Sequence, residues 1–316
     1  MKGPPRRERG IALVLVIWLV ALLLVIAGSF TYSMRTDALA SRNAAAIARG
    51  EAVARAAVAR AVMELFKPPG SPEGWRRDAS LHEWVFDDTP VAVRLSDESA
   101  KIDVNTANQE LLKGLFRFAG LSEEDAVKLL DAVLDWRDPD SLKRPFGAEE
   151  AEYSQASLKG RPANFPFQST EELQLVLGMR PEVFQRIAPM ITVYSRQPGV
   201  NPHIAGRNAL LAIPGVTPEQ VDFYLVERER ARAEGRAPPV FAAAGAYATY
   251  AQATAITVRA EVKLERGITI QREAVAVLTP QFVRRPWTLL AWREVSRDQD
   301  AKRENAPPES ALGQRR

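Results

Sequence analysis

The sequence predicts an α+β protein in which one long N-terminal helix packs on a small antiparallel sheet, with a large all-α domain inserted into that sheet. Three features of the 316-residue chain lead to this expectation. An uncharged apolar run continues into an alanine-rich segment, two strand-like stretches lie far apart, and the residues between them have helical patterning. The predicted segments are 1–10 as a leader, 11–66 as a transmembrane and stem helix, 67–105 and 241–294 as the two parts of the β-layer, 106–240 as the inserted α-domain, and 295–316 as a disordered tail.

The N-terminal helix is predicted from length and composition. Residues 11–34 carry no charge, and the apolar run 11–27 is by itself long enough to cross a bilayer. Alanine, the best helix former, is frequent from there to Phe66, and Pro68-Pro69-Gly70 is expected to end the helix. A helix of about 56 residues would be roughly 84 Å long. Its second half has apolar residues spaced as one buried stripe, comprising Ala46, Ala48, Val53, Ala57, Val58, Ala61, Val62 and Leu65.

Three interpretations of the N-terminus compete. A cleaved secretory signal would use the A-x-A pattern at 38–40, but charged residues precede that pattern and the apolar run is too long. A simple single-pass anchor is the second interpretation. The third is a short basic leader of the prepilin type, cut between Gly10 and Ile11, after which the new amino group of Ile11 is methylated. We favour the third, with the N-terminus in the cytoplasm and the bulk of the chain in the periplasm of a bacterial inner membrane protein.

Charge and composition exclude several classes of function. The net charge of +3 comes from the leader, because removing residues 1–10 leaves 38 basic and 38 acidic residues. The basic excess therefore reflects membrane orientation and does not indicate nucleic-acid binding. Cysteine is absent, which excludes disulfides and thiolate metal sites, and only His82 and His203 are available as histidine ligands.

The β-layer is predicted from alternating residues in two separate regions. Val91, Val93 and Leu95 alternate with polar residues in the first region. A hairpin is expected in the second, with its turn at 265–267. The predicted strands are 83–86 and 90–105 in the first region, and 255–264, 268–278 and 287–292 in the second.

Between these regions the chain carries three helix-start signals, at Ser122, Ser169 and Thr217. A weak internal repeat relates the segment that begins at Asn105 to the one that begins at Asn201. We interpret the pair as helix-hairpin-helix units in which an asparagine caps the first helix.

Helix-hairpin-helix units often bind DNA through the amides of a Pro-Gly-hydrophobic-Gly hairpin. Here Thr217 replaces the second glycine, and Pro218 has no amide proton to donate. The insert also lacks a basic surplus, so DNA binding is disfavoured.

A carboxylate cluster gives the candidate metal site. It comprises Asp135, Asp138, Asp140, Glu149 and Glu150. Several oxygens on a flexible loop suit Ca²⁺, which takes six to eight oxygen ligands. The alternative is a solvated acidic turn with Arg137 and Arg144 as counterions, in which Asp135 caps backbone groups beside Trp136.

No sequence pattern for catalysis accompanies these carboxylates. The chain has no G-x-S-x-G, no phosphate-binding glycine loop and no H-E-x-x-H. We therefore expect a protein that is not an enzyme but a substrate of a prepilin peptidase and a methylase.

At this point the residues resemble one family over nearly the whole length, the K-type minor pseudopilins of bacterial type II secretion systems. The segments that carry the resemblance are 9–13, 102–107, 134–140 (L-D-W-R-D-P-D), 147–149 (G-A-E), 164–167, 171–173 with 178–179, and 191–195. The chain departs from the family at Glu152-Tyr153-Ser154, where Tyr-Tyr is usual, and at His203-Ile204, where Asn-Thr is usual.

The resemblance implies a pilin-like fold with an inserted α-domain, a place at the tip of the pseudopilus, calcium binding, and association with the I- and J-type minor pseudopilins. Pilin-like subunits usually have Glu as the fifth mature residue, where this chain has Leu15, and that absence is characteristic of the K type. We therefore expect a non-enzymatic tip subunit that supports protein export. The alternative is a membrane-tethered periplasmic helix-hairpin-helix protein, DNA-binding or a scaffold, outside any filament.

Overall fold

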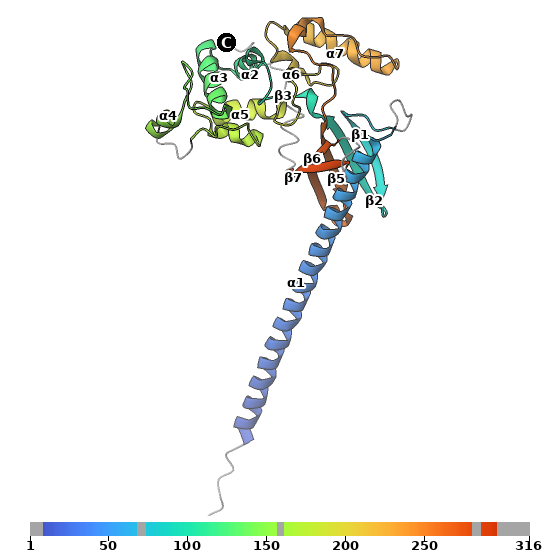
Figure 1. The fold of residues 1–316 in the computed structure, drawn as a ribbon. Helices are drawn as coiled ribbons and strands as arrows, with labels where there is room; N and C mark the ends of the chain where they lie inside the picture. The colour runs from blue at the N-terminus through green and yellow to red at the C-terminus, as the bar shows by residue number, and fades with distance from the viewer. Residues whose placement is uncertain (1–8, 68–73, 157–160, 280–285, 296–316) are drawn as a thin grey trace, which may run out of the picture.

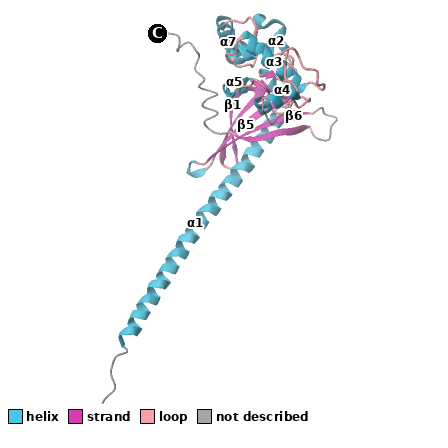
Figure 2. Ribbon diagram, turned by 90° about the vertical axis from the view of Figure 1, so that its left-hand side faces the viewer, coloured by secondary structure: helices cyan, strands magenta, loops and turns pink. Residues whose placement is uncertain are grey.

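The computed structural model describes residues 9–67, 74–156, 161–279 and 286–295 (Figure 1). A single long helix extends from a head that consists of a β-sheet beside the helix and a helical domain beyond the sheet (Figures 1 and 2). The helical domain lies at the end of the molecule opposite the N-terminal half of the helix. The predicted α+β, pilin-like architecture is therefore confirmed.

Helix α1 spans Arg9–Glu64, 56 residues. It ends two residues before the predicted end at Phe66, and Pro68-Pro69-Gly70 lies outside the described residues. Burial begins at Gly50, because that is where α1 reaches the sheet: a Cβ at Gly50 would lie 2.3 Å from Cδ1 of Ile270. The predicted stripe is buried from Val53 to Val62, whereas Ala48 is exposed because it lies before the sheet begins.

Five antiparallel strands form the sheet against α1, in the order β1-β2-β5-β6-β7. Their bounds are β1 Asp78–Phe86, β2 Thr89–Asp97, β5 Ala255–Lys263, β6 Thr269–Leu278 and β7 Trp287–Glu294. The central pair, β2 and β5, joins the two predicted regions, with Val93 opposite Ala260. The helical domain is therefore an insertion between two neighbouring strands.

The core between stem and sheet is built from small and β-branched residues. Val53, Ala57 and Val58 of α1 pack with apolar residues of β2, β5 and β6. Burying one such valine contributes roughly 1.5–3 kcal/mol. An ion pair between Arg272 on β6 and Glu51 on α1 crosses this interface.

One predicted strand is divided in the structure. The expected run 90–105 ends as β2 at Asp97, because the Asp97 carboxylate accepts hydrogen bonds from the backbone N (2.9 Å) and the hydroxyl (2.7 Å) of Ser99 and turns the chain. After the short 3₁₀ helix η1 (Glu98–Ala100), strand β3 (Ile102–Asp103) pairs in parallel with β4 (Ile191–Thr192). This small second sheet belongs to the core of the inserted domain, which is therefore not purely helical.

The inserted domain contains two helical hairpins, α2 with α3 and α6 with α7 (Figure 1). All three predicted helix starts carry capping interactions. The Ser122 hydroxyl accepts a hydrogen bond from Asp125 N, and capping boxes join Ser169 to Glu172 and Thr217 to Gln220. The elements are α2 Gln109–Phe118, α3 Glu123–Arg137, α4 Glu150–Gln155, η2 Thr170–Leu175, α5 Pro181–Ile187, η3 Ala188–Met190, α6 Arg207–Leu211, α7 Pro218–Ala233 and η4 Ala242–Tyr247; η5, Glu265–Gly267, forms the predicted turn between β5 and β6.

The repeated asparagines do not cap helices, contrary to the prediction. Helix α2 is capped by Asn108 and α6 begins after Gly206. The Asn105 amide instead binds both the backbone N and O of Phe167, at 2.9 Å each, and so ties a distant loop to β3. Asn201 accepts a hydrogen bond from its near neighbour His203 N at 3.1 Å. Asn105 and Asn201 therefore stabilise loops and turns, and their similar sequence contexts do not reflect helix capping.

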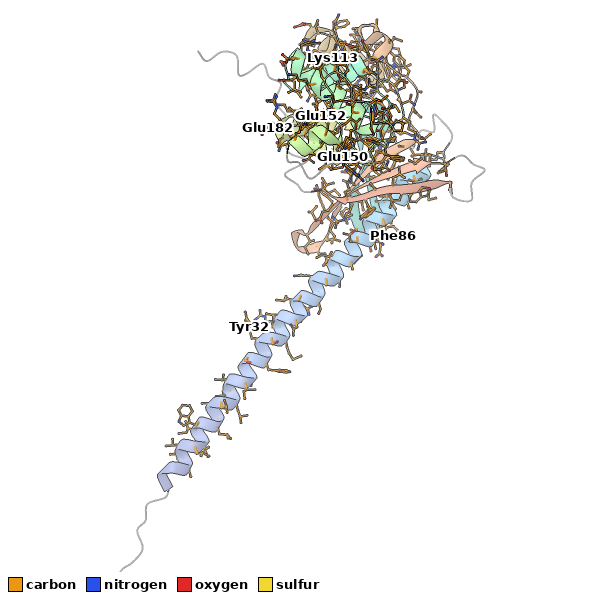
Figure 3. All side chains as sticks on the ribbon, turned by 60° about the vertical axis from the view of Figure 1, so that its left-hand side comes forward. Tyr32, Phe86, Lys113, Glu150, Glu152 and Glu182 are labelled. Atoms are coloured by element: carbon orange, nitrogen blue, oxygen red, sulfur yellow. The ribbon has the colours of Figure 1, made fainter. Side chains whose placement is uncertain are left out.

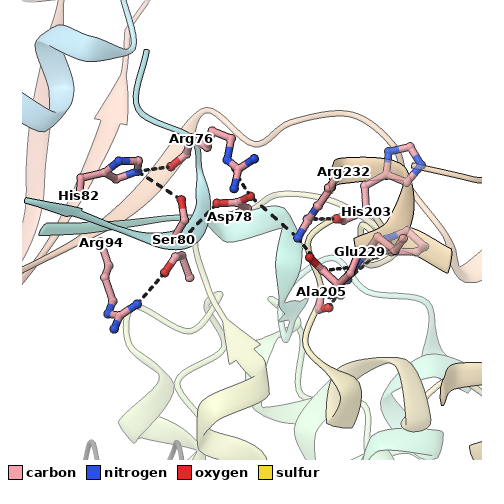
Figure 4. Close-up of polar contacts among 12 residues, drawn as sticks. Arg76, Asp78, Ser80, His82, Arg94, His203, Ala205, Glu229 and Arg232 are labelled. Atoms are coloured by element: carbon pink, nitrogen blue, oxygen red, sulfur yellow. Dashed lines mark hydrogen bonds and ion pairs between the residues drawn. The ribbon is translucent and has the colours of Figure 1, made fainter. Parts of the chain in front are cut away.

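The helical domain is fixed to the sheet by polar contacts at their junction (Figure 4). Arg232 of α7 donates to the carbonyl of His203 and lies 3.9 Å from the carboxylate of Asp78 at the start of β1. A second set of contacts at the junction involves buried Glu98, which accepts hydrogen bonds from Thr192 of β4 and Thr257 of β5. The helical domain and the sheet are therefore joined in part by the buried hydrogen bonds of Glu98.

Candidate functional site

The predicted carboxylates lie where helix α3 ends and the loop to α4 begins. Asp135 is in the last turn of α3 and fully buried, Asp138 follows as the C-cap, and Asp140 is exposed in the loop. Glu149 precedes α4 and is only 9% exposed. Glu150 is exposed at the first position of α4 (Figure 3), and among the described residues no hydrogen bond or ion pair joins it to the other four. The structure therefore brings four of the five candidates together.

Arg144 lies over the buried end of this cluster. Its backbone N donates to the Asp135 carboxylate at 3.2 Å, and its guanidinium lies 3.4 Å from Asp135 and 3.7 Å from Asp138. Asp135 therefore binds a backbone amide and Arg144 serves as a counterion, as the alternative interpretation predicted. Arg137 is different, because its guanidinium donates to the carbonyl of Val104.

Burial and mutual repulsion disfavour the ionised forms of the cluster. The pKa values of Asp135, Asp138 and Glu149 are all raised, in each case chiefly by burial. The next unfavourable contribution is the charge of a neighbour: Asp138 for Asp135, Asp140 for Asp138, and Asp135 for Glu149. The four carboxylates therefore hold more negative charge than Arg144 balances.

Two buried oxygens of the cluster lack a hydrogen-bond partner, Oδ1 of Asp138 and Oε1 of Glu149. Unpaired buried carboxylate oxygens are costly and require a proton, a donor or a cation. Hard oxygen ligands with excess negative charge fit Ca²⁺. Within the described ranges no three acidic or histidine side chains already converge on one point as a metal would require, so ion binding needs the loop to adjust.

Aromatic side chains pack next to the carboxylate cluster, around Trp136. Trp136 lies between Tyr153 and Phe167, with ring centroids 5.9 and 6.1 Å apart. The hydroxyl of Tyr153 accepts a hydrogen bond from Leu177 N, and burial raises the pKa of Tyr153 to about 12. Gly147 is required beside the cluster, because a Cβ there would lie 1.9 Å from Oδ2 of Asp135.

Several buried carboxylates outside this cluster were missed by the sequence reasoning. Asp97, Glu98 and Asp103 hold the junction and the turns around β3. The available signal was an Asp-Glu-Ser run directly after an alternating strand, which is typical of a capped turn. Glu152, which accepts from Glu149 N and pairs with Lys143, was also missed as part of the loop.

In the hairpin that could contact DNA, positions 217 and 218 offer no free amide. Thr217 N donates to the Gln220 side chain at 3.0 Å, and Pro218 has no amide proton. Nearby Lys113 and Arg117 are paired with acidic residues, both with Glu123. A groove of about 430 Å³ separates the two hairpins, but its cations are neutralised in this way.

The N-terminal half of α1 carries the remaining predicted residues. The helix continues through Gly10 and Ile11, and Leu15 is exposed on it like its apolar neighbours. Over the described part of the chain, this is the one helix long and apolar enough to span a membrane. It fits a single-pass membrane anchor.

Comparison with known proteins shows what this chain is similar to. The family model for type II secretion system (T2SS), protein K matches residues 92–198, which include the carboxylate cluster. Two relatives are type II secretion system protein K of Klebsiella pneumoniae, 27% identical over 229 residues, and its counterpart in Aeromonas hydrophila, 24% identical over 210 residues. This chain is a relative of type II secretion system protein K.

The matches to these K proteins cover about two thirds of each chain. The Klebsiella match covers 65% of this chain and 70% of that K protein, and the Aeromonas match covers 59% and 63%. The fold is similar to that of a solved chain from the GspK-GspI-GspJ complex of enterotoxigenic Escherichia coli, with a TM-score of 0.55 and 14% identity over 79% of this chain and 94% of the other. At that identity the likeness establishes a shared fold.

Proposed function

We propose that this K-protein relative is a non-enzymatic minor pseudopilin that caps the tip of the type II secretion pseudopilus and so supports protein export across the outer membrane. The observation that carries the proposal is the continuity of α1. One helix runs from a membrane-length apolar segment to the core beneath the sheet, with the helical domain at the far end (Figures 1 and 2). Before assembly the apolar half would hold the chain in the inner membrane, with the head in the periplasm.

The tip position is supported by two features. Leu15 has no carboxylate with which to contact the N-terminus of a subunit above it. The helical domain extends the head beyond the sheet, away from the stem, where the next subunit would have to add. A subunit with both features can join a filament from below but offers no place for another above.

The expected partners are the I- and J-type minor pseudopilins, which would contact the stem and the β-layer. The support is the fold likeness to a chain of a complex described as containing GspK, GspI and GspJ. A prepilin peptidase would cut between Gly10 and Ile11, and the exposed amino group of Ile11 would be methylated.

We further propose that the carboxylate cluster binds Ca²⁺. Asp135, Asp138, Asp140 and Glu149 would supply the ligands. Glu150, the fifth predicted ligand, is exposed at the start of α4 and lies outside the proposed site. The ion would neutralise excess charge and occupy the unpaired oxygens of Asp138 and Glu149.

The test of the proposed class is the intact mass and N-terminal sequence of the protein from membranes with and without the prepilin peptidase. A chain that begins at methylated Ile11 only when the peptidase is present supports a pseudopilin. An uncleaved start at Met1, or a cut after Ala40, would contradict it and favour a membrane-tethered scaffold outside any filament.

A further inference from the structure

Strand β1 forms one edge of the five-stranded sheet. It pairs with β2 on one side, and on its other side no strand of the described residues pairs with it. The register is irregular only between Asp78 and Leu81, and it is regular from Leu81 to Phe86. Along these six residues, every second residue therefore turns its backbone N–H and C=O toward the open edge.

Beyond the irregularity at its start, this edge lacks several features that usually prevent strand addition. Natural edge strands are protected by lysine, proline, bulges or a covering element. From Leu81 to Phe86 the sequence is Leu-His-Glu-Trp-Val-Phe, with no lysine or proline. Leu81 and Val85 project to the same face and are 47% and 63% exposed, and Phe86 is 41% exposed.

The strand is held in place at both ends. At its start, Asp78 lies near Arg76 (3.3 Å) and Arg232, which joins β1 to the helical domain (Figure 4). At its end, the turn residue Asp87 accepts a hydrogen bond from Arg49 of α1 at 2.8 Å through its carbonyl and pairs with Arg49 at 3.0 Å through its carboxylate. Figure 3 shows Phe86 beside the stem at the end of the sheet. A subunit packed along the stem would therefore meet a pre-ordered strand.

The opposite edge is less accessible. Strand β7 also carries exposed leucines, but Arg293 on it pairs with Glu171 of the helical domain at 2.9 Å. Strand addition there would have to pass that contact, whereas the ion pair between β1 and the helical domain lies at the start of β1, at Asp78.

The charges along β1 indicate the chemistry of the partner. Glu83 lies between Leu81 and Val85 on the exposed face, and Asp88 follows in the turn; neither forms an ion pair with a described residue. A complementary strand would carry apolar residues opposite Leu81 and Val85 and a basic residue opposite Glu83.

We propose that the β1 edge, Leu81–Phe86, binds an extended segment of a neighbouring pilin-like subunit by strand addition. The inference rests on the proposed function, which supplies a neighbour along the stem, and adds the surface and the mode of binding. Backbone hydrogen bonds would hold the segment, and Leu81, Glu83 and Val85 would select it.

The experiment uses the full chain, co-expressed with the I- and J-type minor pseudopilins of the same system and purified from detergent-solubilised membranes. Val85→Lys is compared with Val226→Lys, because Val226 is similarly exposed (66%) but belongs to helix α7 and not to the sheet. We expect Val85→Lys to weaken co-purification by about tenfold or more, with an unchanged melting temperature, and Val226→Lys to have no effect.

Hydrogen exchange separates strand addition from side-chain contact. In the complex, alternate amides from Leu81 to Phe86 should exchange more slowly than in the free chain, because every second amide faces the new strand. A wild-type complex that leaves these amides unprotected, or that Val85→Lys leaves intact, would overturn the β1 assignment while the proposed function stands. A cross-link from a cysteine at position 85 to a second copy of this chain would also overturn it. Failure of the wild type to bind any pilin-like subunit would contradict the proposed function itself.

Discussion

Arg144 lies directly over Asp135: its backbone N is 3.2 Å and its guanidinium Nε 3.4 Å from that buried carboxylate. Arg144 pairs with two of the four carboxylates, and the charge of Arg137 also acts on Asp138. Two of the carboxylates still have unpaired buried oxygens. The loop between α3 and α4 is therefore folded around negative charge that its arginines do not fully neutralise.

Calcium should stabilise the protein through the cluster. We expect Ca²⁺ at 100 times its dissociation constant to add about 2.7 kcal/mol to the free energy of unfolding. Glu149→Gln and Asp138→Asn should remove most of this gain, whereas the matched change Glu150→Gln should keep it, because Glu150 is exposed and apart from the cluster. Thermal unfolding with calcium and with chelator measures the difference. An equal gain in all variants would contradict the assignment.

Without calcium, the cluster should make stability fall as the pH rises. Its pKa values are raised above the ordinary 3.8 of Asp and 4.5 of Glu. The folded state therefore holds protons that the unfolded state has lost, and this stability disappears as the pH rises through the folded pKa values. Chelated protein should show this loss as the pH rises above the ordinary carboxyl values of 3.8 and 4.5. Glu149→Gln should flatten the profile of unfolding free energy against pH.

His203 should produce the opposite dependence near neutral pH. Burial, followed by the charges of Arg228 and Arg232, lowers its pKa below 6.5, and its Nε2 is buried without a partner. The unfolded state then takes up a proton first, so stability is lost as the pH falls below about 6.5. His203→Gln should reduce this loss in denaturant titrations from pH 7.5 to 5.5. His82→Gln is the control, and a similar effect of both variants would rule out the assignment.

The ion pair between Arg272 and Glu51 should stabilise the packing of stem and sheet. The two side chains are only 12% and 25% exposed, so water screens them less than a surface pair. We expect Arg272→Ala to lower the free energy of unfolding by about 1–3 kcal/mol. A double-mutant cycle with Glu51→Ala isolates the coupling. A coupling energy indistinguishable from zero would mean that the loss comes from packing alone.

The elements that were predicted correctly have a local signal. Helix α1 follows from alanine content and charge-free length, and the hairpin of β5 and β6 follows from alternation around Gly267, whose φ of 77° suits glycine. Ser122 and Thr217 cap helices because their hydroxyls reach the amide three residues on. Such signals depend on neighbours in the sequence and are readable without the fold.

The features that could not be predicted depend on distant partners. Ile102 looks like a continuation of β2, yet it pairs with Ile191, and nothing near Ile102 indicates that partner. Asn105 resembles a helix cap but binds Phe167, 62 residues away. The spacing of the acidic residues indicated the carboxylate cluster. That Glu150 lies outside the cluster depends on where α4 begins, which the spacing does not show.

The position of the protein in the filament tests the central claim most directly. Pseudopili are isolated from cells in which this chain carries a small tag on an exposed loop of the helical domain, and the tag is located by gold labelling and electron microscopy. A tip subunit predicts label at one end of each filament and none along the shaft. Label repeating along the shaft would contradict the account.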